Sequence, residues 1–350
     1  MDAKMFLEEL IDTPGVSGYE DEVSKVIKDA FKPYCNEVGR DAFFNVYGKK
    51  IGNGGHEGPK VMLAAHLDEI GLMVKNIDES GFISFTNIGG VDQRILLSQE
   101  VIIHGKERLY GVIGAKPPHL QEKGETAKAV PMDEMVIDVG FSTEAVKEKI
   151  TIGDLITFKS PLISLAGTMV SGKSIDDRAG VVMMLETMKE LDKLVFSGEI
   201  YFVATSQEEV GTRGAIISTY SLDPDIGIAI DVTHGDTPDA PKDETHAMDK
   251  GPVIGMGPNM HPKLTERLLN VARDNEIGHL IEVAPGLTGT DARAMQVSRE
   301  GVPTVLVELP LRYMHTTVET LDMENVKKAA RLTALFIASL KEGWEECLTY

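Results

Sequence analysis

The spacing of apolar residues predicts two helices at the start of the chain. Apolar and aromatic residues recur every three or four positions at Val23, Val26, Ile27, Phe31 and Tyr34, which is the spacing of a helix with one buried face. Ser17-Gly18-Tyr19-Glu20 has the pattern of a capping box, so we expect Ser17 to cap this helix. Pro14-Gly15 separates it from a shorter helix before it. The first forty residues are therefore predicted to be mainly helical.

Short apolar runs alternate with helical patterns over much of the remaining chain. The runs lie at residues 60–66, 199–205, 226–232 and 302–309, and the helical patterns lie at 179–194, from Pro262 onwards and at about 323–341. Strands that alternate with helices form a largely parallel sheet covered by helices on both faces. We therefore expect an α/β fold with a mostly parallel sheet sandwiched by helices.

The stretch from residue 71 to residue 164 has a different pattern. Glycines separate β-like runs at residues 71–74, 82–86, 100–104, 110–114, 136–141 and 154–159, and a helical pattern occurs only at 143–149. Several short strands at near-regular spacing are typical of a small barrel or sandwich. The sequence thus predicts a β domain at 71–164, inserted into a larger domain made of residues 1–70 and 165–350.

Composition and charge exclude several classes of partner. The 350 residues include 55 acidic and 35 basic side chains, which gives a net charge of −20. No basic stripe interrupts this negative charge, so nucleic acid is not an expected partner. No stretch approaches the roughly 20 apolar residues that a membrane span needs. With two cysteines and acidic residues among the first ten positions, we expect a cytoplasmic protein that no disulfide stabilises.

Residues that commonly bind metals follow the predicted strands. These residues are His66 and Asp68, Asp176 and Asp177, Glu208 and Glu209, Asp231, and His315. Four of the five groups come after an apolar run, and ligands gather outside the carboxyl ends of the strands in open α/β sheets. We therefore expect these widely separated residues to meet at one edge of the sheet.

This set of residue types indicates a site for two metal ions. Mixed imidazole and carboxylate ligands suit Zn²⁺, Co²⁺ or Mn²⁺ better than Ca²⁺ or Mg²⁺. Two histidines and three carboxylates exceed the needs of one tetrahedral ion with an open position. They suit two ions about 3.5–4 Å apart that share one carboxylate. Glu208, next to an expected ligand, is available as a general base.

Each of these groups also has a simpler interpretation. His66 alone is typical of a buried, hydrogen-bonded histidine, and Glu208-Glu209 of a solvated loop. Asp176-Asp177 is placed to cap the helix that begins near Ala179, although Asp177 can cap while Asp176 binds metal. His315 follows a proline in a turn-like segment. The convergence of all five groups, and no single motif, supports the metal site.

The chain resembles the TET aminopeptidases, which are di-metal exopeptidases of the glutamyl and deblocking aminopeptidase type, some of them labelled endoglucanases. The resemblance covers almost the whole length. It depends on the motifs Pro14-Gly15-Val16-Ser17-Gly18-Tyr19-Glu20, Ala65-His66-Leu67-Asp68-Glu69-Ile70-Gly71, Lys116-Pro117-Pro118-His119, Ile175-Asp176-Asp177-Arg178-Ala179-Gly180, Gln207-Glu208-Glu209-Val210-Gly211, Gly289-Thr290-Asp291-Ala292 and Met314-His315-Thr316.

The resemblance implies a role for each motif. It implies two zinc or cobalt ions per subunit, one bound by His66 and Asp231, the other by Glu209 and His315, and both bridged by Asp176. Glu208 would act as general base and then as general acid on a hydroxide between the ions.

Further implied roles concern the surroundings of the ions. Asp68 would accept the second ring N–H of His66, and the peptide bond between Asp176 and Asp177 would be cis. Gly289, Thr290 and Asp291 would help to shape the substrate site.

The resemblance further implies the activity and the assembly. The protein would release N-terminal residues from peptides, its catalytic domain would be zinc-peptidase-like, and its β insert would form dimers that assemble into a tetrahedral dodecamer. The preferred N-terminal residue stays open, whether acidic, basic or apolar. A glycosidase using Glu208 and a second carboxylate is an alternative, although a single tryptophan, Trp344, is few for a sugar-binding cleft. A metal-stabilised assembly without turnover is another.

Overall fold

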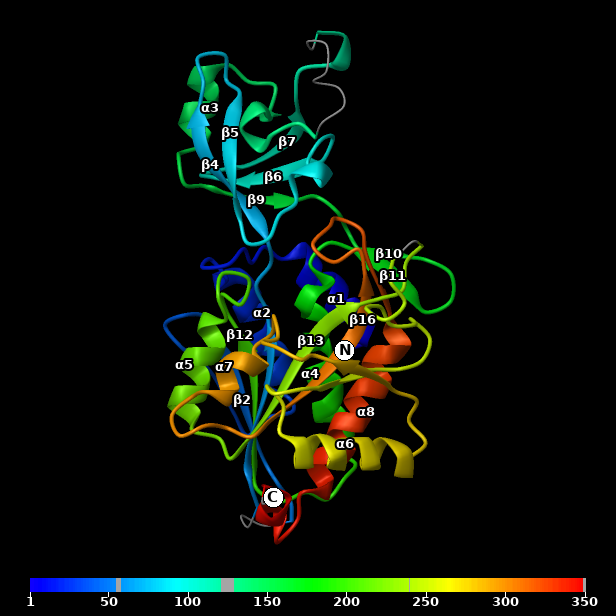
Figure 1. Ribbon diagram of the computed structural model, residues 1–350. Coiled ribbons are helices and arrows are strands. Elements are labelled where there is room, and N and C mark those ends of the chain that lie inside the picture. Colours follow the sequence, from blue (N-terminus) through cyan, green and yellow to red (C-terminus); the bar gives the residue numbers. More distant parts are fainter. Residues whose placement is uncertain (55–57, 121–128, 239, 349–350) are drawn as a thin grey trace.

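The computed structural model describes residues 1–54, 58–120, 129–238 and 240–348. Figure 1 shows a large body of helices packed around a sheet and, beyond it, a small β barrel. The chain enters the barrel directly after the third strand of the large sheet and returns before the helix that begins at Ile175. The predicted α/β class with an inserted barrel is confirmed.

The large sheet contains eleven strands within the described residues, in the order β1-β2-β12-β3-β13-β16-β17-β11-β10, with β14 and β15 attached beside β16. Their bounds are β1 Glu37–Arg40, β2 Val46–Ile51, β3 Lys60–His66, β10 Ile163–Ser164, β11 Met169–Gly172, β12 Glu199–Thr205, β13 Ile226–His234, β14 Val253–Met256, β15 Leu280–Val283, β16 Thr304–Arg312 and β17 Glu319–Asp322. The four central strands, β12, β3, β13 and β16, are parallel. Their carboxyl ends therefore lie at one edge.

Helices cover both faces of this sheet (Figure 1). One face is covered by α1 Ala3–Asp12, α2 Asp21–Phe31, α4 Ile175–Leu191, α6 Pro262–Asp274 and α8 Met323–Ser339, and the other by α5 Arg213–Leu222 and α7 Ala292–Gln296. Side chains alternate between the faces along β3, since Val61 and Leu63 join the first core whereas Met62 and Ala64 join the second. This alternation is the period of two expected for a strand buried on both sides.

The inserted barrel closes through six antiparallel strands in the described part of the chain, in the order β4-β5-β8-β7-β6-β9. They are β4 Gly71–Ile77, β5 Ile83–Ile88, β6 Glu100–His104, β7 Arg108–Gly114, β8 Val136–Asp138 and β9 Leu155–Phe158, accompanied by α3 Thr143–Lys149. Short 3₁₀ turns lie at Gln93–Ile95, Pro118–Leu120, Met132–Glu134 and Trp344–Leu348. The barrel has an apolar core of its own.

The N-terminal capping box is a prediction that the structure contradicts. Helix α2 begins at Asp21, and the side chain of its N-cap residue, Glu20, makes no capping hydrogen bond. The Ser17 hydroxyl instead donates to the carboxylate of Asp68 (2.6 Å), and the Glu20 carboxylate accepts from the backbone N–H of Gln207 (3.1 Å). Both residues of the motif thus hold loops at the carboxyl edge of the sheet. The helical prediction also extends too far, because residues 37–40 form β1.

Among the described residues, no helix is both long and apolar enough to span a bilayer.

Candidate metal centre

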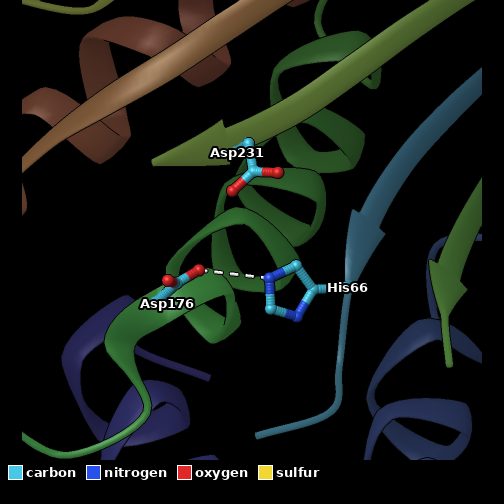
Figure 2. Close-up of side chains that lie close together, drawn as sticks. All are labelled: His66, Asp176 and Asp231. Carbon is cyan, nitrogen blue, oxygen red and sulfur yellow. Dashed lines mark hydrogen bonds and ion pairs between the residues drawn. The ribbon is translucent and has the colours of Figure 1, made fainter. Parts of the chain in front are cut away.

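The residues predicted to bind metal meet at the carboxyl edge of the sheet. His66 ends β3, Asp231 lies near the end of β13, and Asp176 lies in the first turn of α4. Figure 2 shows the side chains of these three residues directed toward one another. Glu209 follows β12 and His315 follows β16. Donor atoms lie within 4.8 Å of one another in two groups, His66 with Asp176 and Asp231, and Asp176 with Glu209 and His315.

Asp176 lies between the two groups. Its Oδ1 is 3.1 Å from the Nε2 of His66, and its Oδ2 is 3.2 Å from the Nε2 of His315. The same His315 nitrogen is 3.2 Å from the Oε1 of Glu209. Two ligands bound 2.0–2.2 Å from one ion at a tetrahedral angle lie about 3.4 Å apart. The spacing of these donors therefore fits one carboxylate shared by two ions.

The start of α4 holds Asp176 in this position. The peptide bond between Asp176 and Asp177 is cis, as expected. The Asp177 carboxylate accepts from the backbone N–H of Gly180 (3.1 Å) and so caps the helix. A β-carbon at Gly180 would lie 2.3 Å from that carboxylate. The two aspartates thus have different roles. Asp177 caps the helix, whereas Asp176 faces His66 and His315.

Glu319 is a residue of the site that sequence analysis missed. Its Oε2 accepts from the backbone N–H groups of Ile175 (2.7 Å) and Asp176 (3.1 Å), and its Oε1 accepts from the backbone N–H of His315 (2.8 Å). Burial and the charge of Asp176 raise the pKa of Glu319 to about 8. One side chain from β17 thus links the backbones that carry two expected ligands. The pairing of β17 with β11, in which Glu319 lies opposite Gly172, brings this side chain to the site. A long-range pairing of this kind leaves no local signal in the sequence.

Asp68 differs in detail from its expected role. The Nδ1 of His66 is 3.2 Å from the backbone carbonyl of Asp68 and 3.6 Å from its carboxylate. The carbonyl is therefore the nearer acceptor for the second ring N–H. The carboxylate accepts from the backbone N–H groups of Glu208 (3.0 Å) and Glu209 (3.3 Å). Asp68 consequently positions the loop after β12.

The inserted barrel also contacts this site. The Nδ1 of His315 is 3.1 Å from the backbone carbonyl of Gly90, which lies between β5 and β6 of the barrel. A β-carbon at Gly90 would lie 2.8 Å from that nitrogen. When Nδ1 donates to this carbonyl, Nε2 is left free to bind metal, which is the arrangement usual for a metal-bound histidine.

Two buried carboxylates at the site have raised pKa values. Burial and the charge of Asp177 raise the pKa of Asp231 well above its usual range. Burial and neighbouring carboxylates such as Asp291 raise the pKa of Glu208 to about 8. Its Oε2 is 4.0 Å from the Nε2 of His66. Burying uncompensated charge is costly, so this donor set fits divalent cations.

A cavity of about 570 Å³ opens over these residues. Gly289 and Thr290, predicted to shape the substrate site, line it. Asp291 lies behind the wall, where it accepts a hydrogen bond from the Thr205 hydroxyl (2.6 Å). The cavity is also lined by Thr233, His234, Glu282, Ala284, Leu287, Thr288, Arg293 and Glu308. Glu282 and Glu308 were not predicted, and burial together with the charge of Glu282 raises the pKa of Glu308 well above its usual range.

Comparison with known proteins gives extensive matches. The M42 glutamyl aminopeptidase family matches residues 45–332. The lysyl aminopeptidase of Pyrococcus furiosus is 37% identical over 340 residues, 96% of each chain. A TET aminopeptidase structure from a marine sediment archaeon of the Thaumarchaeota has a TM-score of 0.93 at 31% identity and covers 99% of both chains. The TET1 peptidase of Pyrococcus horikoshii, described as assembling into a tetrahedron or a large octahedral shell, has a TM-score of 0.85 at 31% identity, covering 97% of this chain and 100% of that one.

Proposed function

Because the chain belongs to the M42 glutamyl aminopeptidase family, we propose that it releases N-terminal residues from peptides at a centre of two divalent ions. The observation that carries this proposal is the position of Asp176, whose two oxygens face the Nε2 atoms of two different histidines. That arrangement provides a shared carboxylate between two metal positions. The acidic cavity above it also attracts the ammonium group of a peptide N-terminus.

Five residues would hold the ions, in the pairs suggested by the two donor groups. His66 and Asp231 would bind one ion, Glu209 and His315 the other, and Asp176 both. When bound, such ions polarise the scissile carbonyl and acidify the attacking water. The nitrogen and oxygen donors suit zinc or cobalt.

Glu208 would be the general base in this reaction. Its carboxylate lines the cavity beside the donor groups, and its backbone N–H is fixed by Asp68. A carboxylate with a raised proton affinity accepts a proton from the attacking water and returns it to the leaving amine. Asp68 acts through the loop that it holds, so it is a positioning residue.

Metal content tests the two-ion proposal. We expect the native protein to hold two zinc or cobalt ions per subunit and to lose aminopeptidase activity on chelation. Asp176→Asn should reduce the content of both ions, whereas Asp231→Asn should reduce chiefly one, as measured by elemental analysis after dialysis. An Asp176→Asn protein that retains two ions and full activity would contradict the shared role of Asp176.

A glycosidase is the competing hypothesis. Two carboxylates suffice for glycoside hydrolysis, and that reaction has no use for His66 and His315 among the acids of this site. Hydrolysis of a glucan that persists after chelation would favour the glycosidase over the peptidase.

We also propose that the chain forms a homo-oligomer through the insert at residues 71–164, in which dimers build a tetrahedral dodecamer. Exposed apolar side chains on the barrel, including Tyr110 and Val112 of β7, support a contact surface there. Light scattering should give a mass of about twelve subunits, and a monomer in solution would contradict this assembly.

A further inference from the structure

We propose that the cavity selects peptides whose N-terminal residue has a cationic side chain, lysine or arginine, and that Glu308 and Glu282 bind that side chain. This inference rests on the proposed aminopeptidase function and adds its substrate class. It is argued from the position of Glu308 beside the metal centre, from its lack of a partner, and from the walls around it.

Glu308 lies one strand away from an expected metal ligand. In the register of the parallel strands β13 and β16, Glu308 is the partner of Asp231. Along β16, Val305, Val307 and Leu309 belong to the core under α4 and α8, whereas Leu306 belongs to the opposite core. The alternation of side chains along a strand therefore places Glu308 on the face that carries Asp231. A group bound at Glu308 would be a neighbour of the scissile bond.

The carboxylate of Glu308 is buried, and no partner for it lies among the described residues. The side chain is 4% exposed and lines the cavity. Its Oε2 has no hydrogen-bond partner, and no hydrogen bond to the other oxygen occurs among the described residues. A buried polar group left unpaired is costly. An ammonium or guanidinium group entering the cavity would supply the missing donors.

Glu282 adds a second acid to the same cavity. Its Oε2 accepts a hydrogen bond from the Thr233 hydroxyl and lies 3.2 Å from the Nε2 of His246. These contacts hold the carboxylate on β15 at the wall of the cavity. Ala284 and Leu287 line the cavity as well, so apolar surface is present for the methylene stem of a lysine or arginine.

Among the described residues, Arg293 also lines the cavity. The charge of Arg293 acts on Asp291, and Asp291 is hydrogen-bonded to Thr205 at the end of β12. In the order β12-β3-β13-β16, Thr205 and Glu308 lie on strands separated by two others. The neighbouring charge that acts on Glu308 is that of Glu282, so Glu308 stays available to a cationic group of a substrate.

A panel of aminoacyl chromophores tests the preference. With the zinc- or cobalt-loaded protein, kcat/KM for lysyl and arginyl substrates should exceed that for leucyl and glutamyl substrates. Glu308→Gln keeps the shape of the side chain and removes the charge. In the Glu308→Gln variant, the substrate cation loses its buried partner. The ratio of kcat/KM for lysyl over leucyl substrates should therefore fall about 30-fold, mainly through a higher KM for the lysyl substrate. Glu300→Gln, the same substitution at an exposed position outside the cavity, should leave the ratio unchanged.

The outcomes separate this inference from the proposed function. Cleavage of leucyl or glutamyl substrates in preference to lysyl ones would overturn the inference and leave the aminopeptidase intact. No cleavage of any substrate by the metal-loaded protein would remove the proposed function itself. If Glu308→Gln folds poorly, Glu282→Gln and competition by free L-lysine against L-norleucine provide the second measurement. Equal inhibition by the two amino acids contradicts a cationic subsite.

Discussion

Buried acids occur in two regions of the molecule, and these regions are built in opposite ways. Glu69, three residues after His66, is 1% exposed. Its carboxylate lies 2.5 Å from the Nζ of Lys173 and 3.2 Å from Nη2 of Arg178, and it accepts from the backbone N–H of Gly15 (3.0 Å). Although burial acts in the opposite direction, these cations lower the pKa of Glu69 to about 2.

Two acids of the cavity, Asp231 and Glu308, lack such ion pairs among the described residues. Within the described part of the chain, the carboxylate of Asp231 accepts one hydrogen bond, from the backbone N–H of its neighbour Val232 (2.8 Å), and its pKa is raised. Glu308 accepts none. Glu69, which stabilises the fold, thus pairs with cations of the chain, whereas no ion pair to Asp231 or Glu308 occurs among the residues that the structure describes. This difference locates the places where cations from outside, metal ions or substrates, are expected to bind.

The largest effect expected from this contrast is on turnover. Glu208→Gln removes the proposed base and should lower kcat by about 10²- to 10⁴-fold. Metal content should stay unchanged, since Glu208 is not among the expected ligands. Steady-state kinetics and elemental analysis measure both. Turnover within a few-fold of the native value would remove Glu208 from the mechanism.

The same substitution at Glu69 should act on folding. Glu69→Gln leaves Lys173 and Arg178 buried without their counter-charge, and breaking a buried pair in this way costs about 3–5 kcal/mol. Urea unfolding of the chelated protein measures the loss, with the exposed Glu300→Gln as control. An unchanged free energy of unfolding would show that the ion pairs of Glu69 do not stabilise the fold.

Stability in acid should also depend on Glu69. Its pKa is about 2 in the folded chain and near 4.5 when unfolded, so its contribution is present above pH 4.5 and is lost as the pH falls toward 2. The difference of 2.5 units corresponds to about 3 kcal/mol. Free energies of unfolding between pH 5.5 and 3 should fall more steeply for the native protein than for Glu69→Gln. Parallel curves would contradict this assignment.

Glu319 is an intermediate case, because backbone N–H groups are its partners. Glu319→Gln replaces one acceptor oxygen by a donor and should disturb Asp176 and His315 together. Loss of such a supporting contact weakens metal affinity by about 10- to 100-fold. Titration with a competing chelator measures this affinity. If the protein folds normally and its zinc affinity is unchanged, the link through Glu319 is unimportant.

The smallest expected effect is a change in stability whose sign depends on whether metal is bound. Asp231→Asn removes a buried, uncompensated acid and should stabilise the chelated protein by about 1 kcal/mol. With zinc present, the same variant should be less stable than the native protein, because it loses part of the stabilisation by bound metal. Melting temperatures with and without chelator give both signs. Destabilisation in both conditions would mean that Asp231 is already compensated by the chain.

Much of the fold follows from local patterns. The alternation of apolar runs with helices predicts the central strands, and the apolar run before His66 predicts β3 within its actual bounds. The inserted barrel follows from glycine-separated runs with little helical periodicity. The convergence of the metal-binding residues follows from the geometry of parallel strands, since their carboxyl ends share one edge.

The remaining features depend on long-range contacts. Ser17 and Glu20 fit a local capping box as well as they fit distant loops, and the structure uses the second option. Glu308 and Glu319 are single acids within or beside apolar runs. An acid in such a position can simply form an ion pair with a basic residue of a neighbouring strand. Whether a cation lies opposite depends on strand register, which a single sequence does not specify.

The contact between Gly90 and His315 joins the barrel to the proposed metal centre. A rotation of the insert relative to the sheet would tilt this imidazole. If subunits dock through the insert as proposed, docking and metal affinity would be thermodynamically coupled, each changing the other by the same factor. Excising the insert to obtain a smaller enzyme would accordingly remove the support that Gly90 gives to His315.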